Sequence, residues 1–123
     1  MTERSIDLTP ALARLAGDRL LLIEMAQFFI ADAPELLQTI QAGVDSGDLE
    51  QVAIAAHSLK GQASTFDAFP CMDHAREIER LARCKHLEEI KPRLMPIREA
   101  LDQVIAALRQ ELNLGESKSI EPH

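Results

Sequence analysis

One long apolar segment constrains this chain more than any other feature. The segment is most apolar from Leu20 to Ala31, with the runs LLLI at 20–23 and FFI at 28–30, and further apolar residues follow at Leu36, Leu37, Ile40 and Val44. A helix that is apolar on so much of its surface is buried on several sides. Pro34 lies within the segment, and because no turn-forming cluster surrounds it, we predict one kinked helix. Other elements must therefore pack around this helix.

Helix-ending and helix-capping residues mark the boundaries of its neighbours. Gly17 and Asp18, and again Gly47 and Asp48, form pairs in which the glycine can end one helix in a left-handed conformation and the aspartate can cap the next. Thr9, which is followed by proline, is typical of a capping residue at a helix start. We therefore expect a short helix over 9–16 before the long one.

The second half of the chain predicts further helices. The helix after the second glycine–aspartate pair should cover 49–66, and Asp67 can cap the one that follows it. The last helix should run over about 87–112, where the apolar spacing is helical. Pro92 and Pro96 lie in its first half and should bend or delay it.

These segments predict an all-α fold, an antiparallel up-down-up-down four-helix bundle with a short additional N-terminal helix. Four Phe and no Trp or Tyr leave an aliphatic core, which favours helices over sheets. Residues 1–115 are expected to form this one domain, and 116–123 a disordered tail. No second apolar seam remains once the bundle forms, so we expect a monomer.

Charge and cysteine content exclude several function classes. A net charge of −7 without a basic cluster argues against nucleic-acid binding. No apolar run is long enough to span a membrane, and no signal-peptide pattern follows Met1. Two cysteines thirteen residues apart on one helix would be separated by roughly 20 Å, too far for a disulfide, and free thiols suit a reducing cytosol. We therefore expect a cytoplasmic protein. The cysteines and nearby histidines match no zinc spacing, so we expect no bound metal: Cys71, His74, Cys84 and His86.

The stretch AAHSLKGQAS at 55–64 is the most informative for chemistry. At about 100° per residue, His57 lies roughly 140° from the centre of the apolar arc of its helix and should point into solvent. The arc is formed by Leu49, Val52, Ala55, Ala56, Leu59, Ala63 and Phe66. An exposed neutral imidazole is a good nucleophile near neutral pH. His57 is therefore the candidate reactive residue, against the simpler interpretation of an ordinary surface histidine.

The neighbours of His57 strengthen that hypothesis. Lys60 lies one turn further on the same face, where a cation could screen the charge of a phosphorylated imidazole. Gly61 lies four residues on, and a glycine inside a helix costs about 1 kcal/mol relative to alanine. A bare backbone beside the ring would let another protein approach closely. Ser64 adds a hydroxyl group one turn further along.

The pentapeptide HSLKG at 57–61, followed by small residues, is similar to the H-x-L-K-G motif of the histidine-phosphotransfer (HPt) domain family. The segments DAPEL at 32–36 and SGDL at 46–49 also resemble those that precede the motif in the family. The next helix places matching residue types at Ala75, Ile78 and Glu79. The resemblance covers roughly residues 18–112.

This resemblance implies a phosphorelay intermediate without kinase activity of its own. His57 would be phosphorylated on a ring nitrogen, Lys60 would help hold the phosphoryl oxygens, Gly61 would leave room for the partner, and Glu79 would hydrogen-bond the ring. The partners implied are receiver domains of hybrid sensor kinases and response regulators, which pass the phosphoryl group from one aspartate to the next. The Mg²⁺ would belong to those partners, and the chain itself would need no cofactor.

A partner-contact surface is expected beside the histidine. Ile54 lies about 60° from His57 on the wheel, and it is either an ordinary exposed apolar residue or a docking contact. Ala53, Glu50 and Gln62 complete the candidate surface. Asp67 stands where family members usually have glycine, and the extra carboxylate could alter partner choice.

Other functions remain open at this point. The chain could be a non-phosphorylated bundle that binds and regulates a kinase or receiver domain, although the intact histidine, lysine and glycine argue against this. It could be the substrate domain of a chemotaxis-type kinase, but the sequence holds no kinase domain, which favours a free-standing carrier. A metal-binding bundle is the fourth alternative.

Overall fold

The structure, a computed structural model, describes residues 6–114, and every regular element in that range is helical. The elements in chain order are α1 (Thr9–Arg14), α2 (Arg19–Ser46), α3 (Leu49–Ser64), α4 (Phe69–Arg83), α5 (Leu87–Ile90), the 3-10 helix η1 (Lys91–Arg93) and α6 (Leu94–Glu111). The predicted tail over 116–123 lies outside the described residues.

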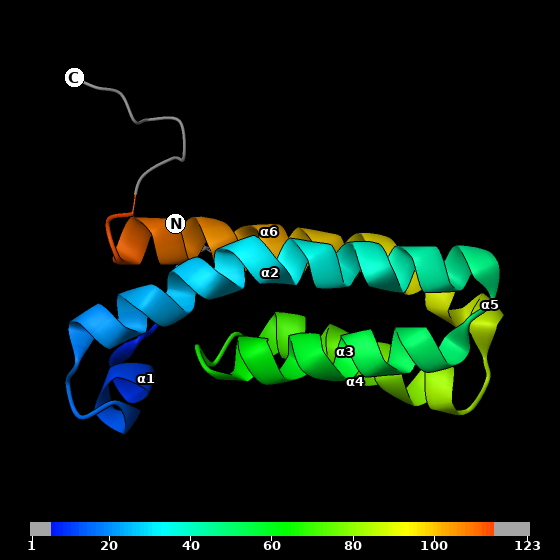
Figure 1. The fold of residues 1–123 in the computed structure, drawn as a ribbon, viewed down its shortest axis with the longest axis horizontal. Coiled ribbons are helices and arrows are strands. Elements are labelled where there is room, and N and C mark those ends of the chain that lie inside the picture. Colours follow the sequence, from blue (N-terminus) through cyan, green and yellow to red (C-terminus); the bar gives the residue numbers. More distant parts are fainter. Residues whose placement is uncertain (1–5, 115–123) are drawn as a thin grey trace, which may run out of the picture.

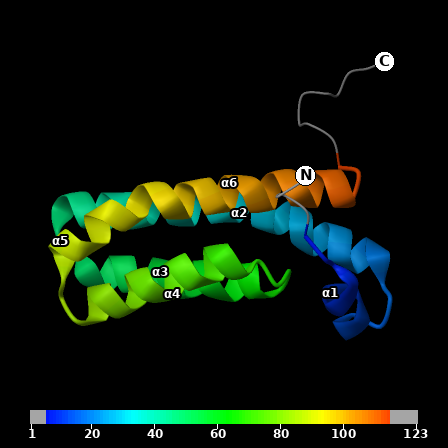
Figure 2. The same ribbon diagram turned by 180° about the vertical axis from the view of Figure 1, so that it is seen from behind.

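The four long helices pack so that each runs antiparallel to the next. Figure 1 shows α2 beside α6 and α3 beside α4, and Figure 2 shows the same two pairs from behind. α3 contacts both α2 and α4, and α6 closes the bundle by contacting α2 and α4. The predicted all-α, up-down-up-down four-helix bundle is therefore confirmed. The short helix α1 lies at the N-terminal end of α2 (Figure 1).

The apolar segment forms one helix, α2, with Pro34 inside it, as predicted. The helix bends along its length (Figure 1). Its core stripe is no more than 3% exposed: Leu22, Ala26, Phe29, Ala33, Leu37 and Ile40. Burial is confined to this stripe in the N-terminal half, however, because Leu20 and Phe28 remain exposed. At this end α2 extends beyond α3, so part of its apolar surface has no cover from the bundle (Figure 1).

The core is aliphatic apart from one aromatic pair. The rings of Phe29 and Phe66 meet edge to face, with centroids 5.4 Å apart and an interplanar angle of 61°. This geometry adds a modest attraction to the apolar area that the two rings bury. Around them the largest buried side chains of the other helices are leucine and isoleucine, including Leu59 and Ile78.

Two of the predicted helix caps are present. The side chain of Asp18 accepts a hydrogen bond from the backbone N–H of Leu21 at 3.0 Å, and Asp48 does the same for Gln51 at 3.2 Å. Gly47, between α2 and α3, has φ +79°, a left-handed conformation that glycine adopts without steric cost. These contacts set where α3 begins, and so set which of its residues face outward.

Two other predicted caps are wrong. Thr9 is already the first residue of α1, and its N–H donates to the side chain of Asp7 at 3.0 Å. Asp67 does not cap α4, whose N-cap is Ala68 without a side-chain hydrogen bond. Asp67 instead has φ +53°, and its carboxylate pairs with Arg14 of α1 at 3.3 Å. The left-handed backbone explains why a glycine would suit this position.

α2 and α3 approach closely near their connecting turn. A Cβ atom added to Gly43 would lie 2.6 Å from Cγ2 of Val52 and 3.1 Å from the carbonyl oxygen of Asp48. Those separations are shorter than van der Waals contact, so only a glycine allows the two helices to cross at this distance.

The predicted last helix is divided into three elements, α5, η1 and α6. Pro92 lies in the 3-10 helix η1, while Pro96 lies in the first turn of α6, where its missing N–H has no helical acceptor. The prolines therefore delay the long helix, as predicted. In residues 6–114 no helix is long and apolar enough to cross a membrane.

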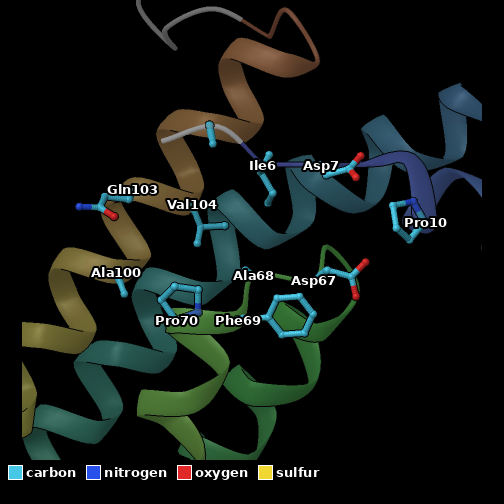
Figure 3. A pocket seen from close by; sticks show the side chains of 11 residues that line it. Ile6, Asp7, Pro10, Asp67, Ala68, Phe69, Pro70, Ala100, Gln103 and Val104 are labelled. Carbon is cyan, nitrogen blue, oxygen red and sulfur yellow. The ribbon is translucent and has the colours of Figure 1, made fainter. Parts of the chain in front are cut away.

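A hollow of about 450 Å³ lies between the N-terminal segment, the turn before α4 and α6 (Figure 3). Its apolar lining includes Ile6, Pro10, Phe69 and Val104. None of the residues predicted for the histidine site lines this hollow.

Candidate functional site

His57 lies in the middle of α3 on the side that faces away from the core. Its side chain is 62% exposed, whereas Ala56 and Leu59 of the same helix are fully buried. The prediction that this histidine points into solvent is therefore confirmed. The rigid helix presents the imidazole ring to any protein that approaches this face.

Glu79 of α4 holds one nitrogen of the ring. Oε2 of Glu79 lies 3.2 Å from Nδ1 of His57, so a hydrogen bond joins α4 to α3. An ionised carboxylate only accepts hydrogen bonds, and we therefore assign the ring proton to Nδ1. The lone pair of the other nitrogen, Nε2, is then available as a nucleophile.

Lys60 binds the other oxygen of the same carboxylate. Its Nζ lies 3.1 Å from Oε1 of Glu79, and its side chain is 28% exposed. The ammonium group is thus placed on the His57 side of α3, as the sequence predicts, and an acid from α4 holds it there.

Arg83 completes the cluster and was not among the predicted site residues. Its Nε and Nη2 lie 3.1 and 3.0 Å from Oε2 of Glu79. The four-residue spacing of Glu79 and Arg83 is a common helical ion-pair pattern. That spacing alone does not indicate a site, because the link to His57 exists only once α4 packs against α3.

The charge of Glu79 is set by this environment. Burial raises the pKa of Glu79, but hydrogen bonds from Lys60 and Arg83 and the positive charge of Lys60 lower it overall below its ordinary value. The carboxylate is therefore ionised at neutral pH and can accept from three donors at once.

Gly61 is exposed, and a Cβ atom added to it would meet nothing within 4 Å. Packing within this chain therefore gives no reason for the glycine. Ser64 is also exposed, and its hydroxyl donates to the carbonyl oxygen of Gly61 at 2.7 Å. The hydroxyl is thus bound to its own helix rather than aimed at the histidine.

One predicted partner-contact residue is misplaced. Ala53 is 2% exposed, because α4 packs along that side of α3 and covers it. The wheel treats the two flanks of His57 alike, but α4 lies closer on the flank that carries Ala53 and Lys60. Ala53 therefore cannot be a surface contact. Ile54, on the other flank, is 57% exposed, and Glu50 is exposed as well.

Ile54 and Glu50 line a hollow of about 390 Å³ between α2 and α3, together with Leu36, Thr39, Asp48, Gln51, Ala55 and Ser58. A second hollow of about 340 Å³ lies further along the same two helices and is lined partly by Leu21, Phe28 and Gln62. Gln62 donates to the carboxylate of Asp32 at 2.7 Å and so links the two helices. The exposed face beside His57 is therefore formed by both helices, and it contains these two partly apolar hollows; we call it the furrowed face.

In the described residues no group of three or more metal-binding side chains could hold an ion. Cys71 is buried, and burial raises the pKa of its thiol to about 12. Cys84 is exposed at the end of α4, and neither cysteine of this region forms a disulfide.

Fold and site together define a helical phosphotransfer module, and comparison with known proteins agrees. The family model described as Hpt domain matches residues 24–111. The chain belongs to the Hpt domain family, which assigns it to histidine phosphotransfer in two-component phosphorelays.

Two solved structures share the fold. Histidine-containing phosphotransfer protein B from Pseudomonas aeruginosa PAO1 superposes with a TM-score of 0.81 at 22% identity, over 94% of this chain and 100% of that one. The HPT domain of a sensor hybrid histidine kinase from Shewanella gives a TM-score of 0.73 at 20% identity, over 92% of this chain and 97% of that one. No curated protein matches the sequence in a direct search.

Proposed function

We propose that this chain is a phosphorelay intermediate that accepts a phosphoryl group on Nε2 of His57 from the aspartate of one receiver domain and passes it to another. The observation that carries the proposal is the exposed imidazole, with Nδ1 bound to Glu79 and a lysine on the same carboxylate. The chain acts as a carrier and has no kinase activity of its own.

The transfer step needs little from this protein beyond position. The lone pair on Nε2 attacks the phosphorus atom of the aspartyl phosphate and forms the N–P bond. The P–O bond to the aspartate breaks, and its electron pair remains on the carboxylate oxygen. Nδ1 keeps its proton, so the ring becomes positively charged beside Glu79. The reverse sequence delivers the phosphoryl group to the next receiver domain.

Lys60 and Gly61 assist this step in different ways. Lys60 has the charge and position to bind a phosphoryl oxygen once one is attached to the ring. Gly61 leaves open space one turn from His57, where the aspartate loop of a receiver domain has to approach. Receiver domains would supply the Mg²⁺ that neutralises the phosphoryl charge during transfer.

The docking surface we propose is the furrowed face of α2 and α3. Ile54 and Phe28 are 57% and 60% exposed, and they line different hollows of that face. Exposed apolar groups beside a reactive group are typical of a protein-binding surface. A receiver domain seated there would cover both residues while its aspartate faces His57.

The test is phosphoryl transfer from a labelled receiver domain to the native chain and to His57→Gln. His86→Gln is the matched control, because His86 is also exposed and also lies near a glutamate, Glu89, at 3.4 Å. We expect acid-labile, base-stable label on the native chain and on His86→Gln, and none on His57→Gln. Label that persists on His57→Gln would mean another acceptor. If a broad panel of phosphorylated receivers and kinases left the native chain unlabelled, a binding-only role would replace this proposal.

A further inference from the structure

Three arginines on α4 form ion pairs with an acid three or four residues away. Each of Arg76, Arg80 and Arg83 donates to a carboxylate about one turn earlier in the helix, on Asp73, Glu77 and Glu79 respectively. The three arginine side chains are equally accessible, at 57–58% exposure. Exposed pairs of this kind contribute little to stability. The arginines therefore differ mainly in what their acids touch.

The acid bound by Arg83 is the one that reaches the reactive residue. Glu79 is 13% exposed, against 67% for Asp73 and 28% for Glu77. One oxygen of Glu79, Oε2, lies close to two of the three guanidinium nitrogens of Arg83, Nε and Nη2, and also to Nδ1 of His57. Arg83 therefore acts on the histidine ring through a single shared atom.

Phosphorylation changes the charge balance of this cluster. Before transfer, Glu79 has two cations beside it, Lys60 and Arg83, and a neutral ring. After transfer, the ring is positively charged with its proton still on Nδ1, so Glu79 has three positive neighbours. The phosphoryl group carries about two negative charges, and the cation proposed to bind it, Lys60, is shared with Oε1 of Glu79. The exposed guanidinium is free to exchange one anion for the other, and its fork can bind two oxygens at once.

We propose that Arg83 is a positioning residue for His57, which orients the ring through Glu79 before transfer and shifts toward the phosphoryl group after it. This inference rests on the proposed function. It gives the cluster two cations with separate tasks. Lys60 is partly buried and holds Oε1 of Glu79, while the more exposed Arg83 responds to the charge of the phosphohistidine.

The test compares Arg83→Gln with Arg76→Gln and Arg80→Gln in the full chain. The main readout is the equilibrium constant of phosphoryl exchange with one receiver domain. We expect Arg83→Gln to shift this equilibrium away from phosphohistidine by about threefold to tenfold, because one mobile cation is lost. The two control variants should stay within about twofold of the native chain, and Arg83→Lys should recover part of the loss. Unchanged thermal unfolding of all four variants would exclude a folding defect.

A second readout does not depend on any partner. Nitrogen-15 NMR of the ring reports which nitrogen of His57 carries the proton, and we expect mainly Nδ1–H in the native chain. Arg83→Gln should reduce that fraction at neutral pH, because the carboxylate that accepts the Nδ1–H hydrogen bond loses the guanidinium that holds it in place.

The outcomes separate the two proposals. Equal effects of all three arginine variants, or equal losses in the forward and reverse rates with an unchanged equilibrium constant, would overturn the positioning role. The latter result would make Arg83 only a docking contact. If the native chain takes no label while the NMR effect is present, the proposed function fails although Arg83 still positions the ring.

Discussion

Two glycines lie inside the long helices of this protein, Gly43 in α2 and Gly61 in α3, and their surroundings are opposite. Gly43 is buried where α2 crosses α3, and an added methyl group would overlap Val52. Gly61 is exposed on the His57 face, and an added methyl group would touch nothing. Both residues carry the same helix penalty of about 1 kcal/mol relative to alanine.

The difference shows which requirement each glycine meets. At Gly43 the folded chain itself requires the absence of a side chain, and the penalty is offset by close packing of two helices. At Gly61 the fold would be better served by alanine, and the proposed docking of a receiver domain would supply the requirement for glycine. A helical glycine that packing does not explain therefore marks the surface where a partner is expected.

The largest effect on stability is expected at Gly43. Gly43→Ala should lower the free energy of unfolding by about 1–3 kcal/mol, the usual cost of overpacking, because Val52 and the backbone at Asp48 have to move. Chemical denaturation measures this directly. Phosphoryl transfer per folded molecule should remain within about twofold of the native rate, since the crossing lies away from His57. A stable variant with impaired transfer would contradict the division between the two glycines.

Gly61→Ala should have the opposite effects, with higher stability and slower phosphoryl transfer. Stability should rise by about 0.5–1 kcal/mol, because alanine is the better helix former and nothing opposes its methyl group. Transfer from a receiver domain should fall by about tenfold or more, since small displacements of reacting groups are costly. Denaturation and transfer kinetics on one preparation provide both values. If transfer were unchanged, open space at Gly61 would have no functional meaning.

The sequence predicts much of this architecture because its strongest signals are local. Helical spacing placed the buried stripe of α3 and the outward direction of His57, and glycine–aspartate pairs located two helix boundaries correctly. These features depend on residues within one or two turns of each other. For the same reason Pro34 could be assigned to a continuous helix, as no turn residues surround it.

The errors at Asp67 and Ala53 arise because contacts with distant parts of the chain determine what surrounds these residues. Asp67 was expected to cap α4, but its backbone is left-handed and its carboxylate binds Arg14 from another helix. Ala53 was expected at the surface, but the approach of α4 covers it. The role of Arg83 depends on the same approach, since its acid reaches His57 only in the folded bundle. Side-chain spacing along one helix contains no information on how closely a second helix packs.

Glu79 is where the distinction between packing and function is weakest, and its expected effect on stability is about as small as that at Gly61. The residue joins α4 to α3 through Lys60 and His57, yet it also belongs to the proposed reaction site. Glu79→Gln should lower the free energy of unfolding by about 1 kcal/mol at pH 7, as charge-assisted hydrogen bonds become neutral ones.

The pH dependence of that difference identifies its origin. Burial raises the pKa of Glu79, while the hydrogen bonds from Lys60 and Arg83 lower it below the ordinary value of 4.5 overall. A carboxylate whose pKa is lower in the folded state stabilises the protein fully above its unfolded pKa, and loses that contribution as pH falls through the folded value. The gap between the native chain and Glu79→Gln should therefore be constant near neutral pH and shrink below about pH 4.5. Urea denaturation at several pH values measures it. A difference in unfolding free energy that stayed constant into strong acid would show that Glu79 stabilises the bundle through packing and not through its charge. Glu79 would then resemble Gly43, which packing within the chain requires, rather than Gly61.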